Sequence, residues 1–155
     1  MSKRVLVIDD DPEIIEVIRD LLEFDKVEVI SAGTGKDGVF QARYKSPSLI
    51  ILDFNLPDMN GFEVFKKIKQ EEPIKDIPVI LITGQTDMNT ISMINELKPT
   101  AVFYKPFQFA HLRRKVKFLL DAESADSIEC RKCGKPLEEI WYYCPFCGLK
   151  ITKKG

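Results

Sequence analysis

The sequence lacks a long hydrophobic run near its N-terminus. Only four apolar residues, Val5–Ile8, follow Met1–Arg4 before three aspartates interrupt the run. A secretory signal needs a longer apolar segment, and a transmembrane helix needs about 20 predominantly apolar residues. This segment fits neither, so we expect a cytoplasmic protein with no membrane partner.

The chain also lacks an excess of charge of either sign, because 23 basic and 24 acidic residues give a formal net charge of −1. Such a chain, taken as a whole, neither attracts nor repels nucleic acid strongly. Hydrophobic residues make up 45% and charged residues 30% of the sequence. This composition is typical of a folded globular protein and argues against disorder or a fibrous repeat.

Cysteine is absent from the first 129 residues, and all four cysteines lie between positions 130 and 147. A disulfide framework is typical of small secreted domains, but the sequence shows no secretion signal. Clustered cysteines in a cytosolic protein indicate a metal site instead.

Short apolar runs alternate with helix-like segments over about residues 1–120. The runs lack alternation with polar residues, apart from the weaker second one, which favours strands buried on both faces of a parallel sheet. They are Val5–Ile8, Val27–Ile30, Leu49–Leu52, Val79–Ile82 and Ala101–Tyr104.

Helices are predicted between these runs by capping residues and by apolar spacing. Asp11 precedes Pro12, a favoured first helical residue, and Asn60 is placed to cap a second helix. A further helix is expected to begin near Phe107. Five strands alternating with five helices predict an α/β protein with right-handed crossovers in an open, doubly wound sheet. Ligands bind such sheets at the carboxyl ends of the strands.

Polar residues follow four of the predicted strands at their carboxyl ends. Asp9, Asp10 and Asp11 follow the first strand, and the third, fourth and fifth lead into Asp53, Thr83 and Lys105. Individually each has an ordinary structural explanation, such as a helix cap at Asp11 or a turn at Asp53. Clustered carboxylates repel one another unless a cation relieves them, and Mg²⁺ prefers such oxygen ligands. Together with Thr83 and Lys105, they predict a site for a metal-bound phosphoryl group.

At these residues the sequence resembles the receiver domains of response regulators in two-component signalling, over about residues 3–120. The resemblance lies in the stretches Val5–Pro12, Leu52–Gly61, Ile82–Gly84 and Lys105–Phe107. It implies a flavodoxin-like sheet of five parallel strands in the order 2-1-3-4-5. It also implies a signalling protein and not an enzyme, apart from self-phosphorylation and slow self-dephosphorylation.

The resemblance assigns a role to each matching residue. Asp53 would accept a phosphoryl group from a histidine kinase or a phosphotransfer protein. Asp10 and Asp53 would bind Mg²⁺ directly, while Asp9 would assist through water and Asn55 would supply its backbone carbonyl. Thr83 and Lys105 would contact phosphoryl oxygens, and the Lys105-Pro106 bond resembles the family's cis peptide.

The resemblance does not extend to one known switch of the family. An aromatic residue often stands three positions before the lysine and swings inward when the threonine moves. Val102 occupies that position here, followed by Phe103 and Tyr104, and Pro99 replaces a glycine-containing turn. The sequence therefore does not say how a phosphorylation signal would propagate.

The C-terminal tail contains two C-x-x-C pairs separated by ten residues, each followed by a glycine. The four thiols belong to Cys130, Cys133, Cys144 and Cys147. Four thiolates suit tetrahedral Zn²⁺, and the tail resembles a short zinc ribbon of the rubredoxin-like kind. Iron, two disulfides or one redox-active pair are the alternatives. We expect a receiver domain at 1–120, a linker at 121–127 and a zinc ribbon at 128–155.

Three functions are compatible with these features. The first is a phosphorylation-switched regulator that signals by binding another protein, whose identity the sequence does not give. The second is a nucleic-acid-binding transcriptional regulator with the ribbon as its output domain. Residues 128–155 hold six basic and three acidic residues, and this surplus supports only weak phosphate binding. The third is a dehalogenase-like phosphatase, which would need a second acid at position 55, where Asn55 stands.

Overall fold

The structure, a computed structural model, describes residues 3–121, 128–129, 136–137, 143, 147–148 and 150. The chain divides between Lys117 and Phe118 into two units, and each is described by itself. No helix in the described part of the chain is both long and apolar enough to cross a membrane.

The first unit is built on five parallel strands. Their order in the sheet is β2-β1-β3-β4-β5, and every neighbouring pair is parallel. The predicted doubly wound sheet and its 2-1-3-4-5 order are therefore confirmed. The strands are β1 (Arg4–Ile8), β2 (Glu28–Ala32), β3 (Leu49–Asp53), β4 (Val79–Thr83) and β5 (Ala101–Tyr104).

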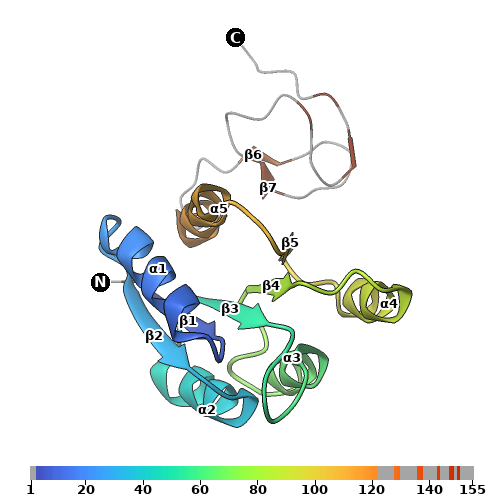
Figure 1. The fold of residues 1–155 in the computed structure, drawn as a ribbon. Helices are drawn as coiled ribbons and strands as arrows, with labels where there is room; N and C mark the ends of the chain where they lie inside the picture. Colours follow the sequence, from blue (N-terminus) through green and yellow to red (C-terminus); the bar gives the residue numbers. More distant parts are fainter. Residues whose placement is uncertain are drawn as a thin grey trace. The chain divides into compact units, whose positions relative to one another are not determined.

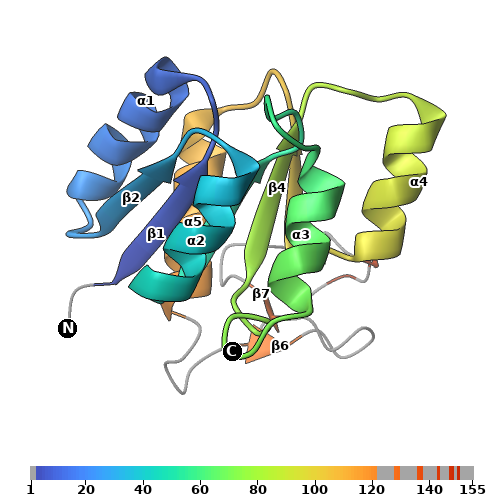
Figure 2. The same cartoon turned by 90° about the horizontal axis from the view of Figure 1, so that it is seen from below.

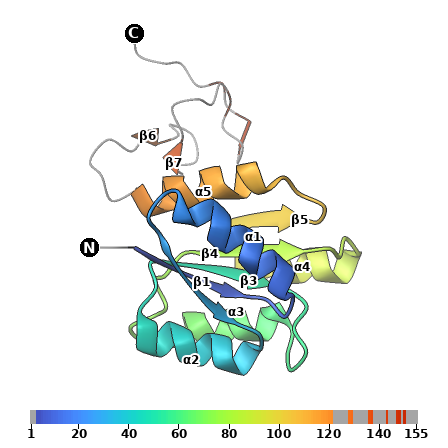
Figure 3. The ribbon, with the colours of Figure 1, turned by 60° about the vertical axis from the view of Figure 1, so that its left-hand side comes forward.

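Helices cover both faces of this sheet. Figures 1 and 3 show α1 and α5 on one face and α2 and α3 on the other. The fourth helix, α4, packs beside α3. The helices are α1 (Pro12–Glu23), α2 (Gly35–Lys45), α3 (Gly61–Lys69), α4 (Met88–Leu97) and α5 (Phe109–Asp121).

The two predicted helix caps are present. The Asp11 carboxylate accepts a hydrogen bond from the Glu13 backbone N–H at 2.9 Å, with Pro12 as the first helical residue. The Asn60 side-chain oxygen accepts one from the Glu63 N–H, also at 2.9 Å. Each bond satisfies a backbone donor that the first helical turn leaves unpaired.

The core lies where the central strands meet the helices. All five residues of β3 and all five of β4 are buried, as expected of continuous apolar strands covered on both faces. The second strand lies at an edge of the sheet, is only half-buried and begins at Glu28, one residue later than predicted. The bounds of β2 are determined by its pairing with β1, in which Arg4 is paired with Glu28 and Ile8 with Ala32. Helix α5 begins two residues later than predicted, at Phe109.

In the second unit the described residues form two short antiparallel pairings. Strand β6 (Ile128–Glu129) pairs with β7 (Pro136–Leu137), and Tyr143 forms a bridge with Lys150. The predicted linker beyond Asp121 and three of the four cysteines, Cys130, Cys133 and Cys144, lie outside the described residues. Cys147 is described and is half-buried.

Candidate functional site

Three carboxylates meet at the carboxyl ends of β1 and β3. The sheet register pairs Ile8 with Leu52, so Asp9 and Asp53 follow as neighbours on adjacent strands. Oxygens of Asp9, Asp10 and Asp53 all lie within 4.8 Å of one another. Figure 2 shows the loops that leave β1, β3, β4 and β5 gathered at this edge of the sheet. The predicted convergence of the acidic residues is therefore present in the fold.

The electrostatics of the cluster favour a cation. Asp9 and Asp53 are only 2% and 4% exposed, whereas Asp10 is exposed. Burial raises the pKa of Asp9 to about 6, and the negative charge of Asp53 adds to this effect. A hydrogen bond from the Asp11 N–H at 2.9 Å and the charge of Lys105 act in the opposite direction. Buried carboxylates that repel one another form the oxygen donor set that a hard divalent ion such as Mg²⁺ prefers.

Lys105 brings a positive charge to the same site from the end of β5. Its Nζ atom lies 3.4 Å from Asp53 Oδ2. The Lys105-Pro106 peptide bond is cis, as the sequence resemblance implied. The Lys105 N–H donates a hydrogen bond of 2.8 Å to the Thr83 carbonyl, which fixes the start of the loop after β5.

Thr83 lies at the end of β4 and is fully buried. Its Oγ1 accepts a hydrogen bond of 3.0 Å from the Gln85 N–H, so the hydroxyl proton remains available to a second acceptor. The contacts continue into α4, because Thr90 Oγ1 lies 3.1 Å from Gln85 Oε1 and 2.7 Å from Asp87 Oδ2. Thr83 is thereby linked to the first turn of α4.

The loop after Asp53 is held at several points. The Asn55 N–H donates to Asp53 Oδ1 at 3.1 Å, and Asn55 and Asn60 form an antiparallel bridge. The Gly61 N–H donates to the Phe54 carbonyl, and a Cβ at Gly61 would lie 2.7 Å from Phe54 Cα. Position 61 therefore requires glycine for this close approach.

Sequence reasoning missed the contribution of Asp58 in the same loop. Its two carboxylate oxygens accept hydrogen bonds from the N–H groups of Gly35 at 2.7 Å and Lys36 at 3.0 Å. These bonds hold the pKa of Asp58 below its usual value and tie the loop to the N-terminus of α2. Sequence reasoning also missed Gln85, Asp87 and Thr90, which connect Thr83 to α4. Asp87 could have been recognised, because an aspartate at this position is a typical helix cap.

Comparison with known proteins agrees with this geometry. The model of the response regulator receiver domain family matches residues 5–117. The alkaline phosphatase synthesis transcriptional regulatory protein PhoP of Bacillus subtilis is 30% identical over 120 residues, covering 77% of this chain and 49% of PhoP. The DNA-binding response regulator MtrA of Mycolicibacterium smegmatis is 29% identical over 157 residues, covering 100% of this chain and 64% of MtrA. The chain thus spans about half to two thirds of the length of these relatives.

Solved structures show the same fold. A CheY-like receiver domain protein from Methanospirillum hungatei superposes with a TM-score of 0.72 at 30% identity, covering 79% of this chain and 96% of that one. The BeF3-activated DrrB receiver domain gives a TM-score of 0.67 at 29% identity, covering 78% and 99%. Receiver domains bind Mg²⁺ at an acidic pocket of the kind formed by Asp9, Asp10 and Asp53. The chain belongs to the response regulator receiver domain family.

Proposed function

We propose that this protein is a phosphorylation-switched response regulator that accepts a phosphoryl group on Asp53. The supporting observation is the position of the Asp53 carboxylate, which lies between two further acidic groups and the Lys105 ammonium, 3.4 Å away. A nucleophile at this point is surrounded by the charges that phosphoryl transfer requires. Asn55 in place of a second acid disfavours the phosphatase alternative.

The proposed reaction forms an acyl phosphate. An oxygen of Asp53 attacks phosphorus, and the bond from phosphorus to the donor's imidazole nitrogen breaks, leaving a neutral histidine on the kinase or phosphotransfer protein. Mg²⁺, held by Asp10, Asp53 and the Asn55 carbonyl with Asp9 acting through water, would neutralise charge on the phosphoryl group.

Two further side chains are assigned to the phosphoryl oxygens. The Lys105 ammonium pairs with one oxygen and offsets the charge that Asp53 gains on phosphorylation. The Thr83 hydroxyl donates its proton to another, since its oxygen is already engaged as an acceptor by the Gln85 N–H. The contacts from Gln85 to Thr90 then offer a route from Thr83 to α4 that does not involve Val102, which packs against the core.

Labelling with acetyl phosphate tests this assignment. In the presence of Mg²⁺ the protein should gain one phosphoryl group, detected by intact-mass spectrometry, and Asp53→Asn should gain none. The asparagine retains the shape of the side chain but is a far poorer nucleophile. Labelling of the Asn variant at the wild-type level would show that the acceptor is another residue.

For the tail we propose a zinc ribbon with Cys130, Cys133, Cys144 and Cys147 as ligands, in the domain division 1–120, 121–127 and 128–155. The paired residues on either side of the cysteines support it. Strands β6 and β7 flank the first C-x-x-C pair, and the bridge between Tyr143 and Lys150 flanks the second. Antiparallel pairs therefore lie on both sides of each thiol pair in the sequence. Zn²⁺ bound by the four thiolates would stabilise the fold of the tail.

Response regulators act between histidine kinases and downstream effectors, and we propose a protein as the effector in this case. A DNA-binding output is the second candidate, because PhoP is named a transcriptional regulatory protein and MtrA a DNA-binding response regulator. Both relatives extend well beyond the matched region. Binding to duplex DNA that weakens steeply with salt would favour the second candidate, whereas binding insensitive to salt would not.

A further inference from the structure

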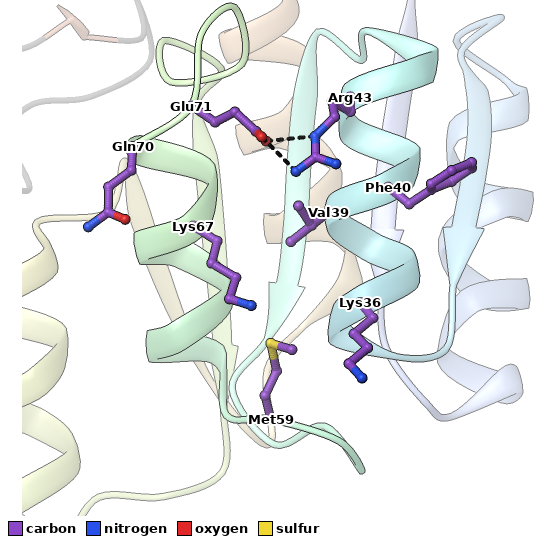
Figure 4. A pocket seen from close by; sticks show the side chains of 8 residues that line it. All are labelled: Lys36, Val39, Phe40, Arg43, Met59, Lys67, Gln70 and Glu71. Atoms are coloured by element: carbon purple, nitrogen blue, oxygen red, sulfur yellow. Dashed lines mark hydrogen bonds and ion pairs between the residues drawn. The ribbon is translucent and has the colours of Figure 1, made fainter.

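A groove of about 520 Å³ separates α2 and α3, on the face of the sheet opposite α1 and α5. Val39 and Met59 provide apolar surface within it. Lys36 lies on the α2 side and Lys67 on the α3 side (Figure 4). The Lys67 side chain reaches toward α2, and Met59 lies between the two helices. The groove therefore combines an apolar floor with cationic walls.

One end of the groove is closed by an ion pair between Arg43 and Glu71. Arg43 Nε lies 2.9 Å from Glu71 Oε2, and Nη2 lies 2.6 Å from Oε1. This bidentate contact pairs the positive charge of the guanidinium with a carboxylate. By contrast, the ammonium groups of Lys36 and Lys67 make no ion pair with any of the residues that the structure describes. Two unpaired positive charges thus remain for a ligand.

An exposed aromatic strip extends the groove along α2. The Phe40 and Tyr44 side chains are 50% and 68% exposed, and their ring centroids lie 4.4 Å apart. The buried residues of α2 are Gly35, Gly38, Val39 and Ala42. Phe40 and Tyr44 are not among them, so packing against the sheet does not explain the two rings. Exposed aromatic rings beside an apolar groove are typical of protein-binding surfaces.

We propose that this groove and strip bind an acidic, amphipathic segment of a partner protein. Carboxylates of the segment would pair with Lys36 and Lys67, while an apolar side chain would enter between Val39 and Met59. A small molecule fits less well, because an open groove with exposed walls cannot enclose most of a ligand's surface. Nucleic acid also fits less well, because two ammonium groups are few for a phosphate backbone.

Titration of the full-length, isotope-labelled protein with the peptide acetyl-Glu-Glu-Leu-Phe-Glu-Glu-amide tests the proposal. Amide signals in Gly35–Arg43 and Met59–Lys67 should shift, with little change in α1 and α5. A peptide with serine in place of Leu-Phe should bind at least about threefold more weakly. The double variant Lys36→Glu/Lys67→Glu should weaken binding by about tenfold or more, a loss expected for two reversed contacts.

A matched control is available on the same two helices. Lys45→Glu/Lys66→Glu changes the net charge equally, but neither residue lines the groove, so binding should weaken by less than about threefold. All four lysines are exposed, and cooperative thermal unfolding would confirm that both double variants fold. A small decrease in stability is expected for the control, because Lys66 Nζ lies 4.6 Å from the centroid of the Phe62 ring. Equal weakening in the two variants, shifts centred elsewhere, no binding at millimolar peptide, or displacement of the peptide by duplex DNA would each overturn the proposal.

Discussion

Asp9 is a residue whose charge opposes folding when no cation is bound. Its pKa is raised from 3.8 to about 6, so between these values the folded state holds more protons than the unfolded state. The free energy of unfolding should therefore fall as pH rises from about 4 to about 6, by on the order of 2 kcal/mol.

We expect Asp9→Asn to remove this decrease in the free energy of unfolding with pH. The substitution should also stabilise the metal-free protein at pH 7.5 by about 1 to 2 kcal/mol. The amide oxygen can still accept the hydrogen bond from Asp11. Urea unfolding in chelator at pH 4.5 and pH 7.5 measures both effects, with Asp20→Asn on the exposed side of α1 as control. A variant that is less stable than wild type at pH 7.5 would contradict the argument.

Adjacent aspartates in the first loop should behave differently on substitution. Asp10 belongs to the carboxylate cluster, so Asp10→Ala should weaken Mg²⁺ binding strongly in calorimetry. Asp11 caps α1 through its bond to the Glu13 N–H, so Asp11→Ala should cost about 1 kcal/mol of stability and leave Mg²⁺ affinity nearly unchanged. Equal loss of Mg²⁺ affinity in the two variants would show that the roles of these aspartates are misassigned.

At the scale of elements, the turn after α1 is tied to α5 by Asp25. Arg113 donates to both Asp25 oxygens, at 2.9 Å and 3.1 Å, and Lys117 Nζ lies 3.5 Å away. The hydrogen bonds from Arg113 lower the pKa of Asp25, which therefore stabilises the fold above its unfolded pKa. This contribution is lost as pH falls through the lower pKa of the folded state.

Asp25→Asn should accordingly lower the free energy of unfolding by about 1 kcal/mol at pH 7, since the arginine is partly exposed. The difference from wild type should disappear at low pH, where both side chains are neutral. Denaturant unfolding across pH 3 to 7 measures it. Glu28→Gln, which breaks the exposed pair with Arg4, is the control and should change stability much less. A difference that is constant with pH would exclude the ionic explanation.

The elements that the sequence predicted well are those whose local signals and packing agree. Strands β3 and β4 are buried on both faces, so their apolar runs match their bounds closely, and Asp11 and Asn60 cap helices through bonds to their own first turns. The edge strand β2 was predicted less accurately, because its bounds depend on pairing with β1.

The contrast between local signals and tertiary contacts also applies to the residues of the candidate site. The approach of Asp9, Asp10, Asp53 and Lys105 to one another could be predicted, because strand ends converge in any doubly wound sheet. Asp58 was missed because its partner, the N-terminus of α2, is brought to it by tertiary packing. The partners of Gln85, Thr83 and Thr90, lie only two and five residues away, but glutamine is not among the residues that mark turns or helix caps. The groove between α2 and α3 likewise depends on how two helices pack, which spacing in one sequence does not reveal.

At the scale of the whole molecule, the tail and the receiver should be separable in function. About 28 residues bury too little apolar surface to offset chain entropy, so metal binding should supply the folding free energy of the tail. We expect one Zn²⁺ per chain by elemental analysis. Cys144→Ser should lose zinc yet still be labelled by acetyl phosphate, because the carboxylate site uses residues of the sheet edge alone. Iron in place of zinc, or a receiver that unfolds with the tail, would contradict this expectation.

The carboxylate cluster also makes the resistance of the protein to proteolysis depend on the concentration of free Mg²⁺. Because a cation that binds only the folded state stabilises it by mass action, each tenfold rise in free Mg²⁺ above the dissociation constant adds about 1.4 kcal/mol to the free energy of unfolding. Depletion of Mg²⁺ would leave the buried carboxylates of Asp9 and Asp53 with only the Lys105 ammonium to offset their charge among the residues that the structure describes. Protease would then reach the unfolded chain more often, so the rate of proteolytic digestion becomes a reporter of how fully the acidic pocket is occupied.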